Sequence, residues 1–156
     1  MKKHTEFLNL AIDLASENVL KGGGPFGAVV VKDNQIIAQT GNSVTLSNDP
    51  TAHAEVNAIR EACRHLDTFH LEGCTIYASC EPCPMCLSAI YWARIDQVFF
   101  AATRDEAAEA GFDDSLIYNE IPKAFSDRLI PFTVLNKEES KTPFLLWKKH
   151  SSKVEY

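Results

Sequence analysis

Three of the five cysteines lie within eight residues, in the segment Ser79-Cys80-Glu81-Pro82-Cys83-Pro84-Met85-Cys86. Two residues separate Cys83 from Cys86, and a candidate partner, His53, lies upstream. Thiolates and imidazoles are preferred ligands of Zn²⁺, and a catalytic zinc takes three protein ligands and leaves one position for water. We therefore predict that His53, Cys83 and Cys86 bind one zinc ion.

Two helices are expected to present these ligands. Pro84 favours the first turn of a helix, because its missing N–H would be unpaired there in any case. A helix over residues 84–92 would place Cys83 at its start and Cys86 three residues further on, so that both sulfur atoms point to one place. The positive end of the helix dipole also lowers the pKa of a thiol. A similar helix is predicted over residues 53–63, where apolar residues recur at helical spacing.

Glu55 follows His53 by two residues, which suits a carboxylate that touches the metal-bound water and not the metal. The alternative is a structural zinc site closed by Cys80 as a fourth ligand, in which Glu55 would have no role. His-x-Glu followed by Pro-Cys-x-x-Cys is the signature of the zinc nucleobase deaminases, and the chain fits every specified position. This pattern leaves Cys80 outside the ligand set, as a packed thiol.

Over essentially its whole length the chain resembles the cytidine-deaminase-like family, and in particular its guanine-specific branch. The segments that resemble this branch are Gly24-Pro25-Phe26-Gly27-Ala28, Asn42, Asp49-Pro50-Thr51, Tyr91-Trp92-Ala93-Arg94, Ala110-Gly111-Phe112-Asp113-Asp114-Ser115 and Tyr156. The resemblance implies zinc-dependent hydrolysis of guanine to xanthine and ammonia, with one Zn²⁺ per subunit. Two alternatives stay open: a deaminase of the same family acting on tRNA adenosine or on cytosine compounds, and a non-enzymatic structural zinc module.

The same resemblance assigns roles to individual residues. It implies that Glu55 and Asp114 are catalytic, and it places at the substrate Phe26, Asn42, Ala54, Trp92, Asp114 and Tyr156. An amide that both donates and accepts suits the edge of a heterocycle, and a carboxylate can accept from the N–H groups of guanine. Five of these residues also have a simpler interpretation: Phe26 and Trp92 as core aromatics, Asn42 as a turn residue, Asp114 as a helix cap and Tyr156 as part of a frayed terminus.

Composition limits the class of protein. With 156 residues, 46% hydrophobic and 23% charged, the chain is long enough for one globular domain with a sizeable core. A formal net charge of −6 argues against a polynucleotide partner and favours a free base or nucleoside, and the resemblance implies a purine base. An odd number of clustered cysteines favours metal binding in a reducing cytoplasm over a disulfide framework. We find no apolar run of the roughly 20 residues that a membrane helix needs.

The hydrophobic pattern predicts an α/β fold, a three-layer α/β/α sandwich with a mixed central sheet of about five strands. The resemblance implies that residues 1–156 form a single zinc-dependent deaminase domain. Helices are expected over residues 7–20, 53–63, 84–92 and 142–149, and strands over residues 26–31, 36–40, 74–78, 97–102 and 130–135. A right-handed crossover should pair strand 97–102 parallel to strand 74–78. The resemblance further implies a homodimer that exchanges residues from about 130 to 156 between subunits, with Tyr156 as a lid.

Overall fold

The computed structural model describes residues 2–135 and 137–156. The chain divides into two compact units, Met1–Asp114 and Ser115–Tyr156. The first unit contains the sheet and every residue of the predicted zinc site, and the second contains the C-terminal helices. None of the described helices combines the length and the apolar character needed to cross a membrane.

The described residues form one sheet of four strands in the order β2-β1-β3-β4. The strands are β1 (Gly27–Lys32), β2 (Gln35–Gly41), β3 (Cys74–Cys80) and β4 (Gln97–Ala102). Strand β1 pairs antiparallel with β2 and with β3, whereas β3 and β4 are parallel. Asp33 and Asn34 both have positive φ, as a tight hairpin turn between right-twisted strands requires. The first four predicted strands and the parallel pairing are therefore confirmed.

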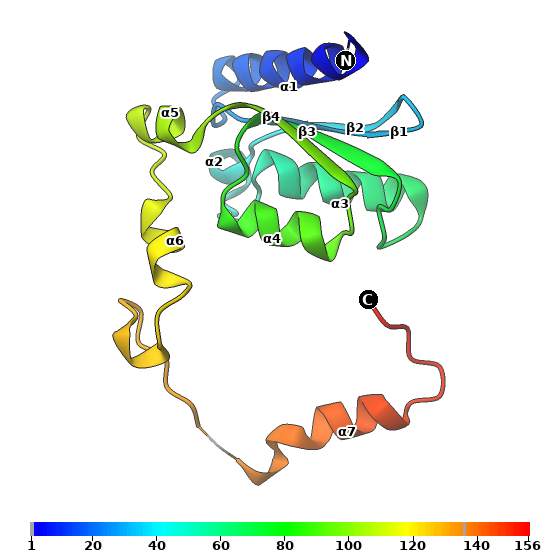
Figure 1. Ribbon diagram of the computed structural model, residues 1–156, viewed down its shortest axis with the longest axis vertical. Coiled ribbons are helices and arrows are strands. Elements are labelled where there is room, and N and C mark those ends of the chain that lie inside the picture. The colour runs from blue at the N-terminus through cyan, green and yellow to red at the C-terminus, as the bar shows by residue number, and fades with distance from the viewer. Residues whose placement is uncertain (1, 136) are drawn as a thin grey trace. The chain divides into compact units, whose positions relative to one another are not determined.

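Helices cover both faces of this sheet (Figure 1). Helix α1 (Lys2–Leu20) lies on one face, and α3 (Ala54–Leu66) and α4 (Pro84–Trp92) lie on the other. Side chains alternate along β1 as a strand requires: Val30 packs in the cluster that includes α3, and Val29 packs in the cluster that includes α1. The predicted α/β/α sandwich is confirmed. There are two further short helices in this unit. In the sequence, α2 (Val44–Ser47) lies between β2 and α3, and α5 (Arg104–Glu109) follows β4.

The second unit is helical. It contains α6 (Ser115–Glu120), two 3₁₀ turns at η1 (Phe125–Asp127) and η2 (Glu138–Lys141), and α7 (Thr142–Lys149), which confirms the predicted C-terminal helix. The predicted fifth strand over residues 130–135 is wrong, because this segment joins no ladder among the described residues. A strand needs a hydrogen-bonded neighbour, and an alternating apolar pattern does not supply one. Pro131 also lacks the N–H that a ladder would use.

Candidate metal centre

The three predicted ligands lie at the starts of two helices on the same face of the sheet. His53 is the N-cap of α3 and Cys83 the N-cap of α4, each with extended backbone angles. Pro84 follows Cys83 at the first helical position, as predicted. Cys86 is then one turn into α4, and its side chain is fully buried. Two short local patterns therefore bring an imidazole and two thiols to one place.

The distances between these ligand atoms fit a tetrahedral zinc site. The Nδ1 atom of His53 lies 3.6 Å from Sγ of Cys83 and 3.5 Å from Sγ of Cys86. Zinc with Zn–S bonds of about 2.3 Å and a Zn–N bond of about 2.0 Å separates sulfur from nitrogen by about 3.5 Å. All three ligand atoms lie within 4.8 Å of one another. The donor set and its spacing both suit Zn²⁺.

The three ligands change one another's pKa values. Hydrogen bonds from the Cys86 thiol and from His53 lower the pKa of Cys83 to about 4, against the opposing effect of burial. The same contact with Cys83, together with burial, raises the pKa of Cys86, and the contact with Cys83 raises the pKa of His53. These shifts favour a thiolate at Cys83 beside His53, and ionisation of Cys86 as well requires a further positive charge such as a metal ion.

Glu55 lies beside the ligands, in the first turn of α3. Its side chain is only 7% exposed, and burial raises the pKa of its carboxyl group. The carboxylate accepts a hydrogen bond from the Cys86 thiol and interacts electrostatically with Cys83 and His53. A buried carboxylate without a compensating partner is costly. Its position against three metal ligands places a proton acceptor directly at the candidate metal centre.

Cys80 differs from the two cysteine ligands. It is buried at the end of β3, and its thiol donates to the carbonyl oxygen of Thr103 at 3.6 Å. Burial raises the pKa of Cys80 to about 11, so the thiol is neutral at neutral pH. Among the described residues, the group of ligand atoms within 4.8 Å contains His53, Cys83 and Cys86 and leaves Cys80 out. This arrangement favours an open three-ligand site over a closed four-ligand one.

Of the predicted substrate residues, Asn42 and Phe26 lie together. Asn42 follows β2, is 7% exposed, and donates its backbone N–H to the carbonyl oxygen of Phe26 at 3.0 Å. Its side-chain oxygen accepts from the N–H of Val44. The ring of Phe26 meets Phe112 edge to face with centroids 5.0 Å apart. The segment before β1 and the segment after β2 thus form one ordered loop pair.

The other predicted substrate residues have different surroundings. Ala54 is fully buried at the start of α3, and its carbonyl accepts from the Thr40 hydroxyl. Asp114 is half-buried, and burial, followed by the negative charge of Cys83, raises the pKa of its carboxyl group. Trp92 is 67% exposed at the end of α4, and Tyr156 is an exposed residue of the second unit. The lid role predicted for Tyr156 stays a prediction.

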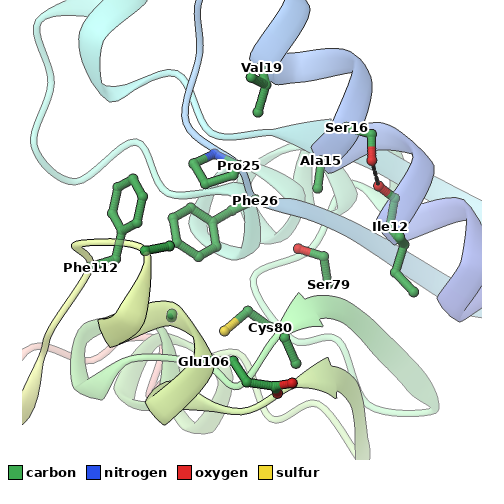
Figure 2. Close-up of a pocket in the computed structure, with 13 residues that line it drawn as sticks. Ile12, Ala15, Ser16, Val19, Pro25, Phe26, Ser79, Cys80, Glu106 and Phe112 are labelled. Carbon is green, nitrogen blue, oxygen red and sulfur yellow. Dashed lines mark hydrogen bonds between the residues drawn. The ribbon is translucent and has the colours of Figure 1, made fainter.

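Sequence reasoning did not anticipate an open cavity of about 330 Å³ on the α1 side of the sheet. Figure 2 shows Phe26 and Phe112 at one side of it and Cys80 lining it from the end of β3. Its remaining lining is mainly apolar and includes Ile12, Ala15, Val19, Ala107 and Ala110. No chemical motif marks these residues, and the lining residues do not include the metal ligands.

Comparison with known proteins agrees with this geometry. Residues 1–102 match the cytidine and deoxycytidylate deaminase zinc-binding region. Guanine deaminase of Bacillus subtilis (strain 168) is 57% identical over 154 residues, which cover 98% of this chain and 99% of that protein. An X-ray structure of guanine deaminase from Bacillus subtilis superposes with a TM-score of 0.97 and covers 98% of both chains. The tRNA-specific adenosine deaminase of Aquifex aeolicus (strain VF5) is 49% identical over 62% of this chain and 64% of its own length.

The fold and the three-ligand centre define a zinc-binding deaminase scaffold. The chain belongs to the cytidine and deoxycytidylate deaminase family.

We predict that Cys86→Ser loses bound zinc while Cys80→Ser keeps about one zinc ion per chain, because a three-ligand site does not use Cys80. The two substitutions are chemically identical and lie six residues apart, so each controls for the other. Elemental analysis after dialysis against a weak chelator measures the zinc content. Equal zinc loss in both variants would support a closed four-ligand site instead.

Proposed function

We propose that this chain is a zinc-dependent deaminase that hydrolyses guanine to xanthine and ammonia. The observation that carries the proposal is a three-ligand metal site with a buried carboxylate, Glu55, beside it. The identity of 57% to Bacillus subtilis guanine deaminase, over nearly the full length of both chains, supports guanine as the substrate.

The residues supply the proton transfers that this hydrolysis needs. His53, Cys83 and Cys86 would hold the zinc ion, which would supply a Lewis acid that makes water a stronger nucleophile at neutral pH. Glu55 accepts a proton from the attacking water and delivers it to the ring nitrogen next to the amine-bearing carbon, which makes that carbon more electrophilic. The hydroxyl group of the water adds to that carbon, and Glu55 then takes the remaining hydroxyl proton and delivers it to the exocyclic amine. The exocyclic C–N bond breaks as the C=O bond of xanthine forms, and ammonia leaves.

Recognition of guanine is assigned to a small set of side chains. The amide of Asn42 donates to and accepts from the ring edge, and the ring of Phe26 packs on the purine face. The carboxylate of Asp114 accepts from guanine N–H groups and assists proton transfer to the departing amine. Ala54, fully buried beside His53, leaves room for the ring. We assign Trp92 to the pocket wall and Tyr156 to the lid.

A second candidate substrate is adenosine in tRNA, because the Aquifex aeolicus enzyme of that name is 49% identical over 62% of this chain. The formal net charge of −6 disfavours it, since binding to a polynucleotide depends strongly on basic side chains that contact phosphates. A base within RNA must also be flipped into a pocket that stays open to the backbone. A lid at Tyr156 would obstruct that entry.

We expect the zinc-loaded protein to release ammonia from guanine far faster than from adenine, cytidine or tRNA, as measured by a coupled ammonia assay. Glu55→Gln should keep its zinc and lose guanine turnover by about 10²- to 10⁴-fold, since the amide cannot carry the proton. Zinc content of the variant is the control for ligand integrity.

Faster turnover of tRNA or cytidine than of guanine would contradict the proposed substrate. Near wild-type activity of the Glu55→Gln variant would contradict the proposed proton transfer while leaving the substrate assignment intact.

Asp114→Asn should lower kcat/KM for guanine by about 10- to 100-fold, the loss expected when a hydrogen bond to a charged group disappears. Its melting temperature should stay near that of the wild type, because the side chain is only half-buried. The adjacent, exposed Asp113 provides a matched control in Asp113→Asn. Equal kcat/KM values for the two variants would mean that Asp114 has only a structural role.

We also propose a cytoplasmic homodimer in which residues from about 130 to 156 are exchanged between subunits. Helix α7 exposes a continuous apolar run, Phe144, Leu145, Leu146 and Trp147, which a second copy of the chain would cover. Cysteine ligands must stay reduced to bind zinc, which suits a reducing compartment.

Light scattering should therefore give twice the mass of one chain, and Leu146→Glu should shift the protein toward monomer by placing a charge in the contact. Lys149→Glu, at the end of the same helix, is the control and should leave the mass unchanged. A wild-type monomer at all concentrations would contradict both the dimer and the exchange.

A further inference from the structure

The backbone of Asn42, whose side-chain amide is proposed to contact the substrate, is held from one side by a second asparagine. The side-chain nitrogen of Asn18, near the end of α1, donates to the backbone carbonyl oxygen of Asn42 at 2.7 Å and to that of Gly24 at 2.8 Å. Both partners are carbonyl oxygens, which can only accept, so the amide nitrogen must be the group that faces them. Asn18 therefore ties the loop before β1 to the residue after β2.

A third asparagine holds the same segment from the other face of the sheet. The side-chain nitrogen of Asn57, in α3, lies 3.1 Å from the carbonyl oxygen of Gly41 and 3.1 Å from the hydroxyl of Ser43. These two residues flank Asn42 in sequence. Because α1 and α3 cover opposite faces of the sheet (Figure 1), Asn42 is fixed by both helical layers.

Three glycines make room for this arrangement. A Cβ atom at Gly23 would lie 2.3 Å from Nδ2 of Asn18, and one at Gly41 would lie 2.6 Å from its Cγ. A Cβ atom at Gly24 would lie 3.0 Å from Cγ of Asn42. The φ angles of all three glycines lie outside the left-handed region, so backbone conformation does not account for them. Glycine is required at these positions because the side chains of Asn18 and Asn42 occupy the space that a Cβ atom would need.

We propose that Asn18 and Asn57 are positioning residues that fix the substrate-contacting amide of Asn42. The proposal rests on the proposed function, which places that amide at the guanine ring. Displacement of a reacting or binding group by about 1 Å can lower activity by about 100-fold, so hydrogen bonds remote from the substrate can control its binding. Asn18 and Asn57 act through Asn42 and do not contact guanine.

Asn18→Asp tests this role. The carboxylate has the same shape but turns two donated hydrogen bonds into repulsion between oxygen atoms, so kcat/KM for guanine should fall by about 10- to 100-fold, mainly through KM. Bound zinc should stay unchanged. Asn9→Asp is the matched control, because it makes the same chemical change at an exposed position of the same helix. Asn18→Ala removes the donors without adding a charge and serves if the carboxylate prevents folding.

A double-mutant cycle separates positioning from a general effect on the fold. If Asn18 acts through the Asn42 side chain, Asn18→Asp should add little to the loss already caused by Asn42→Ala. Losses that multiply in the double variant would overturn the proposal, as would kinetics of Asn18→Asp equal to those of Asn9→Asp.

Hydrogen exchange gives a measurement without substrate. The backbone N–H of Asn42 donates to Phe26, and loss of the Asn18 hydrogen bonds should speed its exchange by about 10-fold relative to wild type. Unchanged exchange would overturn the positioning role whether or not guanine is the substrate. Faster exchange in a protein that does not deaminate guanine would count against the proposed function alone.

Discussion

The structure depends on a geometric constraint: three ligand atoms must lie about 3.5–3.8 Å apart while a fourth direction stays open for water. The starts of α3 and α4 meet this constraint, with His53 and Cys83 as N-caps and Cys86 one turn further. Both helices pack on the same face of the sheet, so their positive ends converge on the thiolate-bearing site. The sheet itself contributes no ligand to this group; it fixes the helices whose first turns do.

Electrostatics explains why such a site would be built around a cation. Two thiols and the Glu55 carboxyl group are buried together, and burial opposes ionisation of all three. Without a metal ion, a single thiolate at Cys83 is favoured and the proton stays on Cys86. A bound divalent cation would compensate the remaining negative charge, so metal affinity and folding of this region are coupled. The thiol of Cys80 is neutral, donates to Thr103 and adds no negative charge to the site.

Local patterns could be predicted from the sequence, and non-local pairings could not. The cysteine ligands could be predicted because Pro84 sets the start of α4, and Cys83 and Cys86 then lie within one helical turn. The predicted strand over residues 130–135 failed because its pattern says nothing about a pairing partner. The role of Asn18 was missed because it depends on a hydrogen bond to Asn42, which is distant in sequence. One signal was available: Asn18 follows Leu14 by four residues and Ala15 by three, on the sheet-facing stripe of α1, where an amide needs partners.

The central claim is that zinc keeps three protein ligands and one position for water. X-ray absorption at the zinc edge of the purified, metal-loaded protein tests it most directly. The account predicts two sulfur neighbours at about 2.3 Å and two nitrogen or oxygen neighbours at about 2.0–2.1 Å. Three sulfur neighbours and one nitrogen would mean that Cys80 completes the coordination, which would contradict an open site and the hydrolysis derived from it.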